Sequence, residues 1–205
     1  VSSVIVFFLS IFAAYYIRRL PKLLKGVLDV VLTLPLVLPP TVVGYFLLLV
    51  FGLRRPLGVF LDEYGIRFVM TWYGGVLSAA VVSFPLMYRT VRGAFESYDE
   101  TLSEAGRTLG MSNTKIFWRV MMPYSRSGIL AGFVLSFARA LGEYGATSML
   151  IGYTPGRTAT ISTTVYQMWR TNNDEAALFY VLINLAISTV ILLIANLLEK
   201  KTRRS

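Results

Sequence analysis

The chain has 205 residues, of which 55% are hydrophobic and 15% are charged, and it contains neither cysteine nor histidine. This composition is not typical of a soluble domain, and the two absent residue types exclude disulfides, thiolate sites and imidazole metal sites. The net charge of +9 indicates either an anionic partner or the topology of a membrane protein.

Long apolar segments predict an all-α, polytopic membrane protein. A spanning helix needs about 20 mainly apolar residues to cross roughly 30 Å of hydrocarbon, and five segments have about that length. They predict a single transmembrane domain over residues 1–205, with spans at about 1–17, 27–53, 71–91, 127–151 and 176–198. The first segment begins at Val1 without a basic flank, which is typical of a span whose start has been removed rather than of a secretory signal.

The placement of the basic residues separates the two interpretations of the net charge. Five spans leave the chain ends on opposite sides, and 14 of the 20 basic residues fall on one side: Arg18, Arg19, Lys22, Lys25, Arg89, Arg92, Arg107, Lys115, Arg119, Arg126, Lys200, Lys201, Arg203 and Arg204. The positive-inside rule makes that side cytoplasmic, so we expect the N-terminus outside, and the C-terminus and the loop 92–124 inside. Because these residues follow topology, nucleic-acid binding is not expected.

Three prolines interrupt the second predicted span. Pro35, Pro39 and Pro40 each remove a backbone donor, so this helix should be kinked or locally unwound. Such a kink either serves packing alone or lines a pathway, because a polar cavity can satisfy the freed carbonyls. In the third span, Ser83 and Pro85 indicate another break near its inner half.

The fourth span contains the only charges predicted to lie at mid-membrane, Arg139 and Glu143. Burying either charge alone would cost about 2.5 to 3.5 kcal/mol, and their spacing of four residues places them on one helical face. The pair either holds the helix bundle together or contacts an anionic substrate or a gate. External connections with short interfacial helices are expected at residues 53–70 and 153–177.

The loop 92–124 is too long for a tight turn and too short for a domain. Ser97 and Glu100 have capping-box spacing at the start of a first helix, and Gly110 is placed to end it. Ser112 or Asn113 can cap a second helix, which Pro123 should end. The apolar surface of this pair of helices comes from Leu102, Leu109, Met111, Ile116 and Phe117.

This loop resembles the "EAA" loop of ABC importer permeases, in which Glu-Ala-Ala precedes a Gly and then Ile-x-Leu-Pro at fixed spacing. The matching residues are Glu104, Ala105, Gly106, Gly110, Val120, Met122 and Pro123, with Gly106 in place of the second Ala. With "LPLVLPPTVVGY", "SFPLMYRTVR" and "LSFARALGEYGAT", nearly the whole chain resembles the permeases of molybdate and tungstate importers. Sulfate and thiosulfate permeases are similar, and we keep them as the alternative.

The resemblance implies a type I importer rather than an enzyme. It implies a second copy of the chain, a cytosolic ABC ATPase dimer, an extracytoplasmic oxyanion-binding protein and the cytoplasmic membrane as partners, without a cofactor or metal. In this family the loop, which we call the coupling loop, contacts the ATPase, and the chain has no phosphate-loop motif of its own. The residues expected to couple are Glu104, Ala105, Gly106, Arg107, Leu109, Gly110, Met111 and Pro123.

The residues expected to line or gate the translocation path are Pro35, Pro39, Pro40, Ser83, Pro85, Arg139 and Glu143. Two other classes of protein are less consistent with the sequence. A secondary anion transporter should show an inverted repeat and intramembrane ion ligands, and neither is visible. A membrane scaffold without transport would leave the polar breaks in three spans unexplained.

Overall fold

The computed structural model describes the backbone of residues 1–203 and the side chains of residues 1–194. Every regular element in that part of the chain is a helix, as the sequence predicts. The elements are α1 Ser2–Ile17, α2 Lys22–Val37, α3 Pro40–Phe51, α4 Pro56–Glu63, α5 Trp72–Glu96, α6 Glu100–Thr108, α7 Asn113–Ile116, a π-helix Phe117–Met121, α8 Met122–Tyr124, α9 Arg126–Leu141, α10 Gly145–Ile151, α11 Ile161–Arg170 and α12 Asp174–Arg203.

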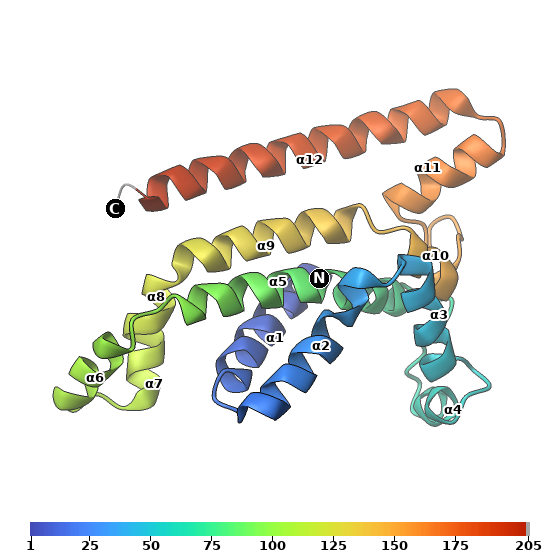
Figure 1. Cartoon of the computed structure of the whole chain (residues 1–205). Coiled ribbons are helices and arrows are strands. Elements are labelled where there is room, and N and C mark those ends of the chain that lie inside the picture. Colours follow the sequence, from blue (N-terminus) through green and yellow to red (C-terminus); the bar gives the residue numbers. More distant parts are fainter. Residues whose placement is uncertain (204–205) are drawn as a thin grey trace.

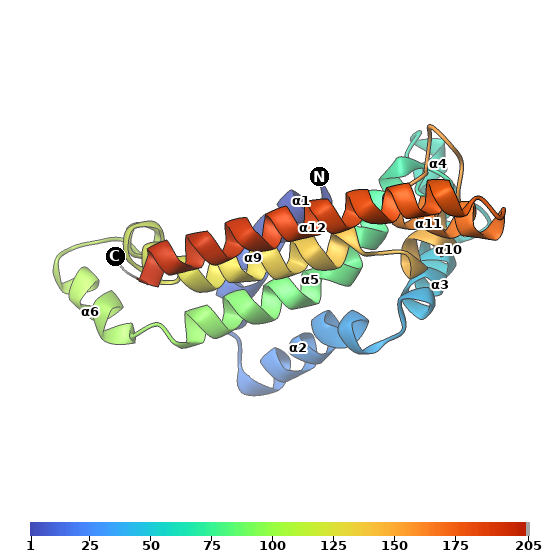
Figure 2. The ribbon, with the colours of Figure 1, turned by 90° about the horizontal axis from the view of Figure 1, so that it is seen from above.

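Three long helices form the body of the molecule. Helices α5 and α9 lie side by side along its length, and α12 packs on the opposite face of α9 (Figures 1 and 2). Helices α1 and α2 pack against α5. The coupling loop lies at one end of the body, which we call the loop end, and α3, α4 and α10 lie at the other end, the far end (Figure 1).

The apolar core is divided into two clusters that follow this division. The loop-end cluster joins α1, α5, α9 and the coupling loop through Val6, Ile11, Ala14, Ile17, Met87, Tyr88, Val91, Phe95, Tyr98, Phe117, Met121 and Ile129. The far-end cluster joins α3, α5 and α10 through Val43, Leu47, Val82, Ala146, Leu150 and Ile151. Among the residues whose side chains are described, α5 alone contributes buried residues to both clusters, so it connects the two ends.

The helices account for the predicted spans with differences in detail. Helices α5 and α12 are each long and apolar enough to cross a membrane within the described residues. The α2–α3 pair, bent by 117°, and the α9–α10 pair, bent by 54°, pass the same test jointly, and α1 is a shorter apolar helix. Five apolar helical units therefore match the five predicted segments, and their membrane boundaries stay predictions. The basic residues from Lys200 onward lie outside the part whose side chains are described.

The break predicted at Ser83 and Pro85 is wrong, because α5 runs without interruption from Trp72 to Glu96. The Ser83 hydroxyl donates to the carbonyl oxygen of Ala79 at 2.7 Å, within the helix. Both Ser83 and Pro85 are fully buried. Helices α1 and α9 pack along α5 and hold it through the proline, as neighbouring helices do in membrane proteins.

Candidate functional site

Helix α6 of the coupling loop begins at a capping residue other than the predicted one. Ser97 is the C-terminal cap of α5, and its amide donates to the carbonyl oxygen of Gly93. Asp99 caps α6 instead, because its carboxylate accepts the amide proton of Thr101 at 2.9 Å. This hydrogen bond holds the pKa of the Asp99 carboxyl below its usual range. The capping box predicted from Ser97 and Glu100 is therefore replaced by an aspartate cap two residues later.

Gly110 ends α6 as predicted. Its φ of +76° is in the left-handed region, which glycine adopts without steric cost. The Gly110 amide donates to Arg107 O at 2.9 Å, and the Met111 amide donates to Gly106 O at 3.0 Å. These two bonds form a Schellman motif, which satisfies carbonyls at the end of the helix.

Gly106, which departs from the family pattern, has a packing reason. A methyl group added at Gly106 would lie 3.1 Å from Cγ1 of Ile116, a buried residue of α7. Helix α7 therefore lies closer to α6 than an alanine would allow without a small shift. Ser112 caps α7 by accepting the Lys115 amide proton at 3.3 Å, as the sequence predicts.

The second helix of the loop ends at Tyr124, one residue after Pro123, close to the predicted end. The chain passes from α7 into the π-helix, where the Met122 amide bonds to Phe117 O five residues back, and then into α8. Pro123 lies in α8, and its missing N–H removes a hydrogen bond from the last turn of the continuous helical segment, which ends one residue later. The helical segment ends at Tyr124, and α9 begins at Arg126.

The predicted coupling residues differ in exposure. The apolar side chain of Leu109 is 81% exposed beside the Gly110 bend, whereas Ile116 and Phe117 are buried and hold the loop together. Met111 is half-buried. The exposed predicted coupling residues are Glu104, Ala105, Arg107, Leu109, Gly110 and Pro123. The loop thus presents polar side chains together with exposed apolar ones, of which Leu109 beside the bend is more exposed than Leu102 and Trp118.

At the far end, the second predicted span breaks at Leu38 and Pro39. Both residues are extended, with ψ values of 142° and 136°, because a residue that precedes a proline is disfavoured in the helical region. Pro40 then starts α3 as its first residue. Pro35 lies inside α2 without breaking it and lines an apolar hollow between α1, α2 and α5.

The predicted Arg139–Glu143 pair is present at the α9–α10 bend. Arg139 Nη1 donates to Glu143 Oε2 at 2.8 Å, and Glu143 Oε1 accepts the Ala146 amide proton at 2.7 Å. The Glu143 side chain is 1% exposed and that of Arg139 is 29% exposed. One carboxylate thus neutralises the arginine at the end of α9 and caps α10.

The two bends contact each other. A methyl group added at Gly145 would lie 2.8 Å from Cβ of Pro40, and one added at Gly44 would lie 2.8 Å from Cα of Ala146. Helices α3 and α10 therefore pack backbone to backbone. Of the predicted path residues, the fold brings Pro40 against Gly145, two residues after Glu143, while Pro35, Ser83 and Pro85 lie along other parts of α2 and α5.

Sequence reasoning missed two polar features near this site. Ser78 of α5 and Thr147 of α10 form a buried hydroxyl–hydroxyl hydrogen bond of 3.0 Å. A hollow beside Gly142 is lined by Ser162 of α11 and by Asn184 and Ser188 of α12. The polar residues inside the apolar α12 segment were the available signal, but their position beside the α9–α10 bend depends on tertiary packing.

The chain belongs to a known family of transport proteins. Residues 7–204 match the model of the family described as "Binding-protein-dependent transport system inner membrane component". The fold and the family together define a multi-pass permease subunit of an ABC transporter, which is not itself an enzyme.

Three relatives cover most of this chain. The molybdenum transport system permease protein ModB of Escherichia coli (strain K12) is 43% identical over 99% of this chain and 91% of its own length. The Haemophilus influenzae protein of the same name is 38% identical over 96% of this chain and 86% of its own length. The sulfate transport system permease protein CysW of Synechococcus elongatus is 34% identical over 94% of this chain and 67% of its own length.

Solved structures support the fold. A chain of a bacterial alginate ABC transporter, solved with a pentasaccharide-bound periplasmic protein, has a TM-score of 0.73 at 16% identity. The match covers 98% of this chain and 76% of the transporter chain. A chain of the MetNI methionine ABC transporter has a TM-score of 0.68 at 13% identity, and the match covers 98% of this chain and 93% of that chain. At these identities the likeness concerns the fold alone.

Proposed function

We propose that this chain is the permease subunit of an ATP-driven importer that moves molybdate or tungstate across the cytoplasmic membrane. The observation that carries the proposal is the 43% identity to a molybdenum transport permease over 99% of the chain. The coupling loop supports it, because a helix pair that protrudes from the loop end suits contact with a cytosolic ATPase subunit (Figure 1). The complex would contain two copies of this chain, an ATPase dimer and an external oxyanion-binding protein.

The orientation that we propose places the loop end in the cytoplasm, with the N-terminus outside and the C-terminus inside. In the structure, Arg18, Lys25 and Arg92 form ion pairs with Glu96 or Glu100 of the coupling loop, and Arg107 lies in the last turn of α6. This clustering of basic residues at one end is what the positive-inside rule requires of the cytoplasmic face.

The α9–α10 bend suits an anion path without a tight binding site. Glu143 neutralises most of the charge of Arg139, whose side chain is still partly exposed. Guanidinium N–H groups that remain available can lower the barrier for a divalent oxyanion, and the neighbouring carboxylate keeps the anion from binding strongly. Release into the cytoplasm would therefore be fast, and selection among oxyanions would rest with the external binding protein.

Uptake by the reconstituted complex tests the proposal. Proteoliposomes that contain this chain, the ATPase subunit and the binding protein should accumulate molybdate only when ATP is supplied to the cytoplasmic side. Sulfate supplied in the same assay decides the alternative that the sulfate permeases suggest, since preferred uptake of sulfate would replace the proposed substrate. Uptake by the chain alone under an ion gradient would instead indicate a secondary transporter.

Two coupling-loop variants test the role of the loop. Gly110→Pro should block the left-handed turn at the end of α6, because proline fixes φ near −65°. Glu104→Lys reverses the charge of an exposed side chain of α6. Both variants should fold, and both should separate ATP hydrolysis from uptake. Normal uptake by the two variants would contradict the coupling role.

A further inference from the structure

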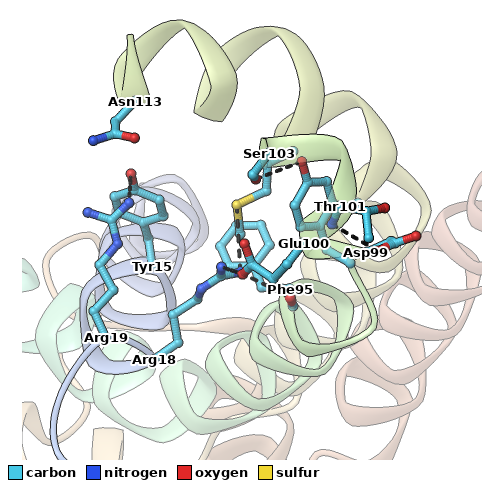
Figure 3. A network of polar contacts seen from close by, with 12 residues as sticks. Tyr15, Arg18, Arg19, Phe95, Asp99, Glu100, Thr101, Ser103 and Asn113 are labelled. Carbon is cyan, nitrogen blue, oxygen red and sulfur yellow. Dashed lines mark hydrogen bonds and ion pairs between the residues drawn. The ribbon is translucent and has the colours of Figure 1, made fainter. Parts of the chain in front are cut away.

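Arg18 connects the end of α1 to both ends of the coupling loop (Figure 3). It follows the last turn of α1, and its Nη1 donates to the carbonyl oxygen of Phe95 at 3.1 Å and lies 3.8 Å from Sδ of Met121. Its Nη2 is paired with the carboxylate of Glu100. Phe95 and Glu100 flank the entry into the loop, and Met121 ends the π-helix by which the chain leaves it.

These contacts fix position more than they add stability. The Phe95 carbonyl is one of the last four of α5, which have no partner within the helix, so the guanidinium supplies the missing donor. Glu100 is 57% exposed in its side chain, and ion pairs with such an exposed partner contribute little to folding. The planar guanidinium donates in several fixed directions at once, which suits it to hold two segments in one geometry.

Helix α2 is tied to the same region by a second set of ion pairs. Arg92 of α5 pairs with Asp29 of α2 and, at 3.0 Å, with Glu96, and Lys25 of α2 lies 2.8 Å from Glu96. Helix α2 has no fully buried residue, so core packing alone does not fix its position. These pairs therefore join α2, which leads to the bend at Pro39, to the last turns of α5.

We propose that Arg18 is a positioning residue for coupling, which makes the coupling loop move as one body with α1 and α2. A displacement of the loop by an ATPase subunit would then reach the α2–α3 bend through α2 itself. This inference rests on the proposed function, because it takes the coupling loop as the contact with the ATPase.

Arg19 provides a matched control one residue away. Among the described residues, the hydrogen bond and the cation–π contact of its guanidinium are both with Tyr15 of its own helix, 4.0 Å from the ring centre (Figure 3). Arg18→Gln and Arg19→Gln therefore remove the same charge from the same end of α1. Only the first of these substitutions removes contacts with the coupling loop.

The first measurement is the amount of molybdate imported per ATP hydrolysed by the complete complex in proteoliposomes. Arg18→Gln should lower this ratio at least threefold with the ATPase still bound, and Arg19→Gln should leave it unchanged. Glu100→Gln should lower it less, and the double variant should match Arg18→Gln, because the two residues share one contact. An unchanged ratio in Arg18→Gln and Glu100→Gln would overturn the inference, whereas no ATP-dependent uptake by the unmodified complex would overturn the proposed function instead.

The second measurement follows the positions directly and does not require transport. The chain has no native cysteine, so spin labels can be placed at Leu23→Cys on α2 and Thr114→Cys on α7, both exposed positions. In complexes with one labelled copy, the distance between labels should be narrow and equal with and without ATP. Arg18→Gln should broaden it and Arg19→Gln should not. A distance that changes with ATP in the unmodified chain, or that stays narrow in Arg18→Gln, would overturn the inference.

Discussion

The coupling loop and the two bends at the far end are both places where helices stop and restart, yet different contacts hold them. Around the bends, α3 and α10 approach backbone to backbone at Gly44 and Gly145, and the charge of Glu143 is enclosed. Around the loop, the ion pair between Arg18 and Glu100 has one partner largely exposed to solvent. Both ends have an apolar cluster, but the bends add backbone-to-backbone packing, whereas the loop end adds partly exposed ion pairs that can be exchanged for contacts with a partner.

Removal of the buried carboxylate should have the largest effect on stability. Glu143→Ala leaves Arg139 without its partner and α10 without its cap, which should cost about 3 to 5 kcal/mol of unfolding free energy. Replacing both residues by methionine should recover most of this loss, because no unpaired charge remains. Denaturant unfolding in detergent measures both variants. Asp62→Asn, which breaks an exposed pair with Arg67, is the control and should change little.

The close approach of α3 and α10 should give the next largest effect. Gly44→Leu places a side chain against the backbone of Ala146 and should cost about 1 to 3 kcal/mol of unfolding free energy. Gly26→Leu in α2 is the matched control, because a Cβ added there meets no atom within 4 Å. Equal unfolding midpoints for the two variants would mean that packing does not fix the far end.

The turn at the tip of the coupling loop should respond more weakly. Gly110→Ala keeps the left-handed φ only at a cost of about 1 to 2 kcal/mol, and Gly110→Asn should cost less. The affinity for the ATPase subunit, measured by titration of the purified subunits, should fall in the same order. Gly93→Ala, at an open helical position, should leave this affinity unchanged. A tight complex with Gly110→Ala would show that the loop adapts without this turn.

The smallest expected effect is the pH dependence of the Asp99 cap. Its pKa is lowered in the folded state, so its contribution is complete above the ordinary aspartate pKa of about 3.9 and is lost as the pH falls through the lower folded value. A carboxyl-carbon NMR titration should place the midpoint of Asp99 below that of an aspartate in an unfolded peptide. An ordinary midpoint would mean that the cap does not form.

Features that depend on local sequence were predicted correctly. The bend at Pro39 and Pro40, the end of α6 at Gly110, the cap at Ser112 and the Arg139–Glu143 contact each involve residues at most four apart. The capping residue of α6 was assigned wrongly because Ser97 and Asp99 are both good caps, and where α5 ends decides between them. The continuity of α5 through Pro85 could not be read from the sequence, because it depends on the helices packed around it.

Features that join distant segments had no signal in a single sequence. The contacts of Arg18 cross 77 to 103 residues, and the contact of Gly145 with Pro40 requires both bends to be placed first. Gly106 was recognised as a departure from the family pattern, but its reason is a side chain ten residues later on another helix. Function was therefore easier to infer than mechanism, because the coupling motif is local whereas transmission is not.

The π-helix has a consequence for the direction in which the loop faces. A π-turn holds one residue more than an α-turn, and each residue advances a helix by about 100°. If the extra residue were wound as ordinary α-helix, α6 and α7 would turn about that axis by roughly that angle, whereas the wider π-turn takes it up within a single turn. The direction in which Leu109 faces is thus kept by this widened turn, and a loop of the same length wound as α-helix throughout would point Leu109 elsewhere.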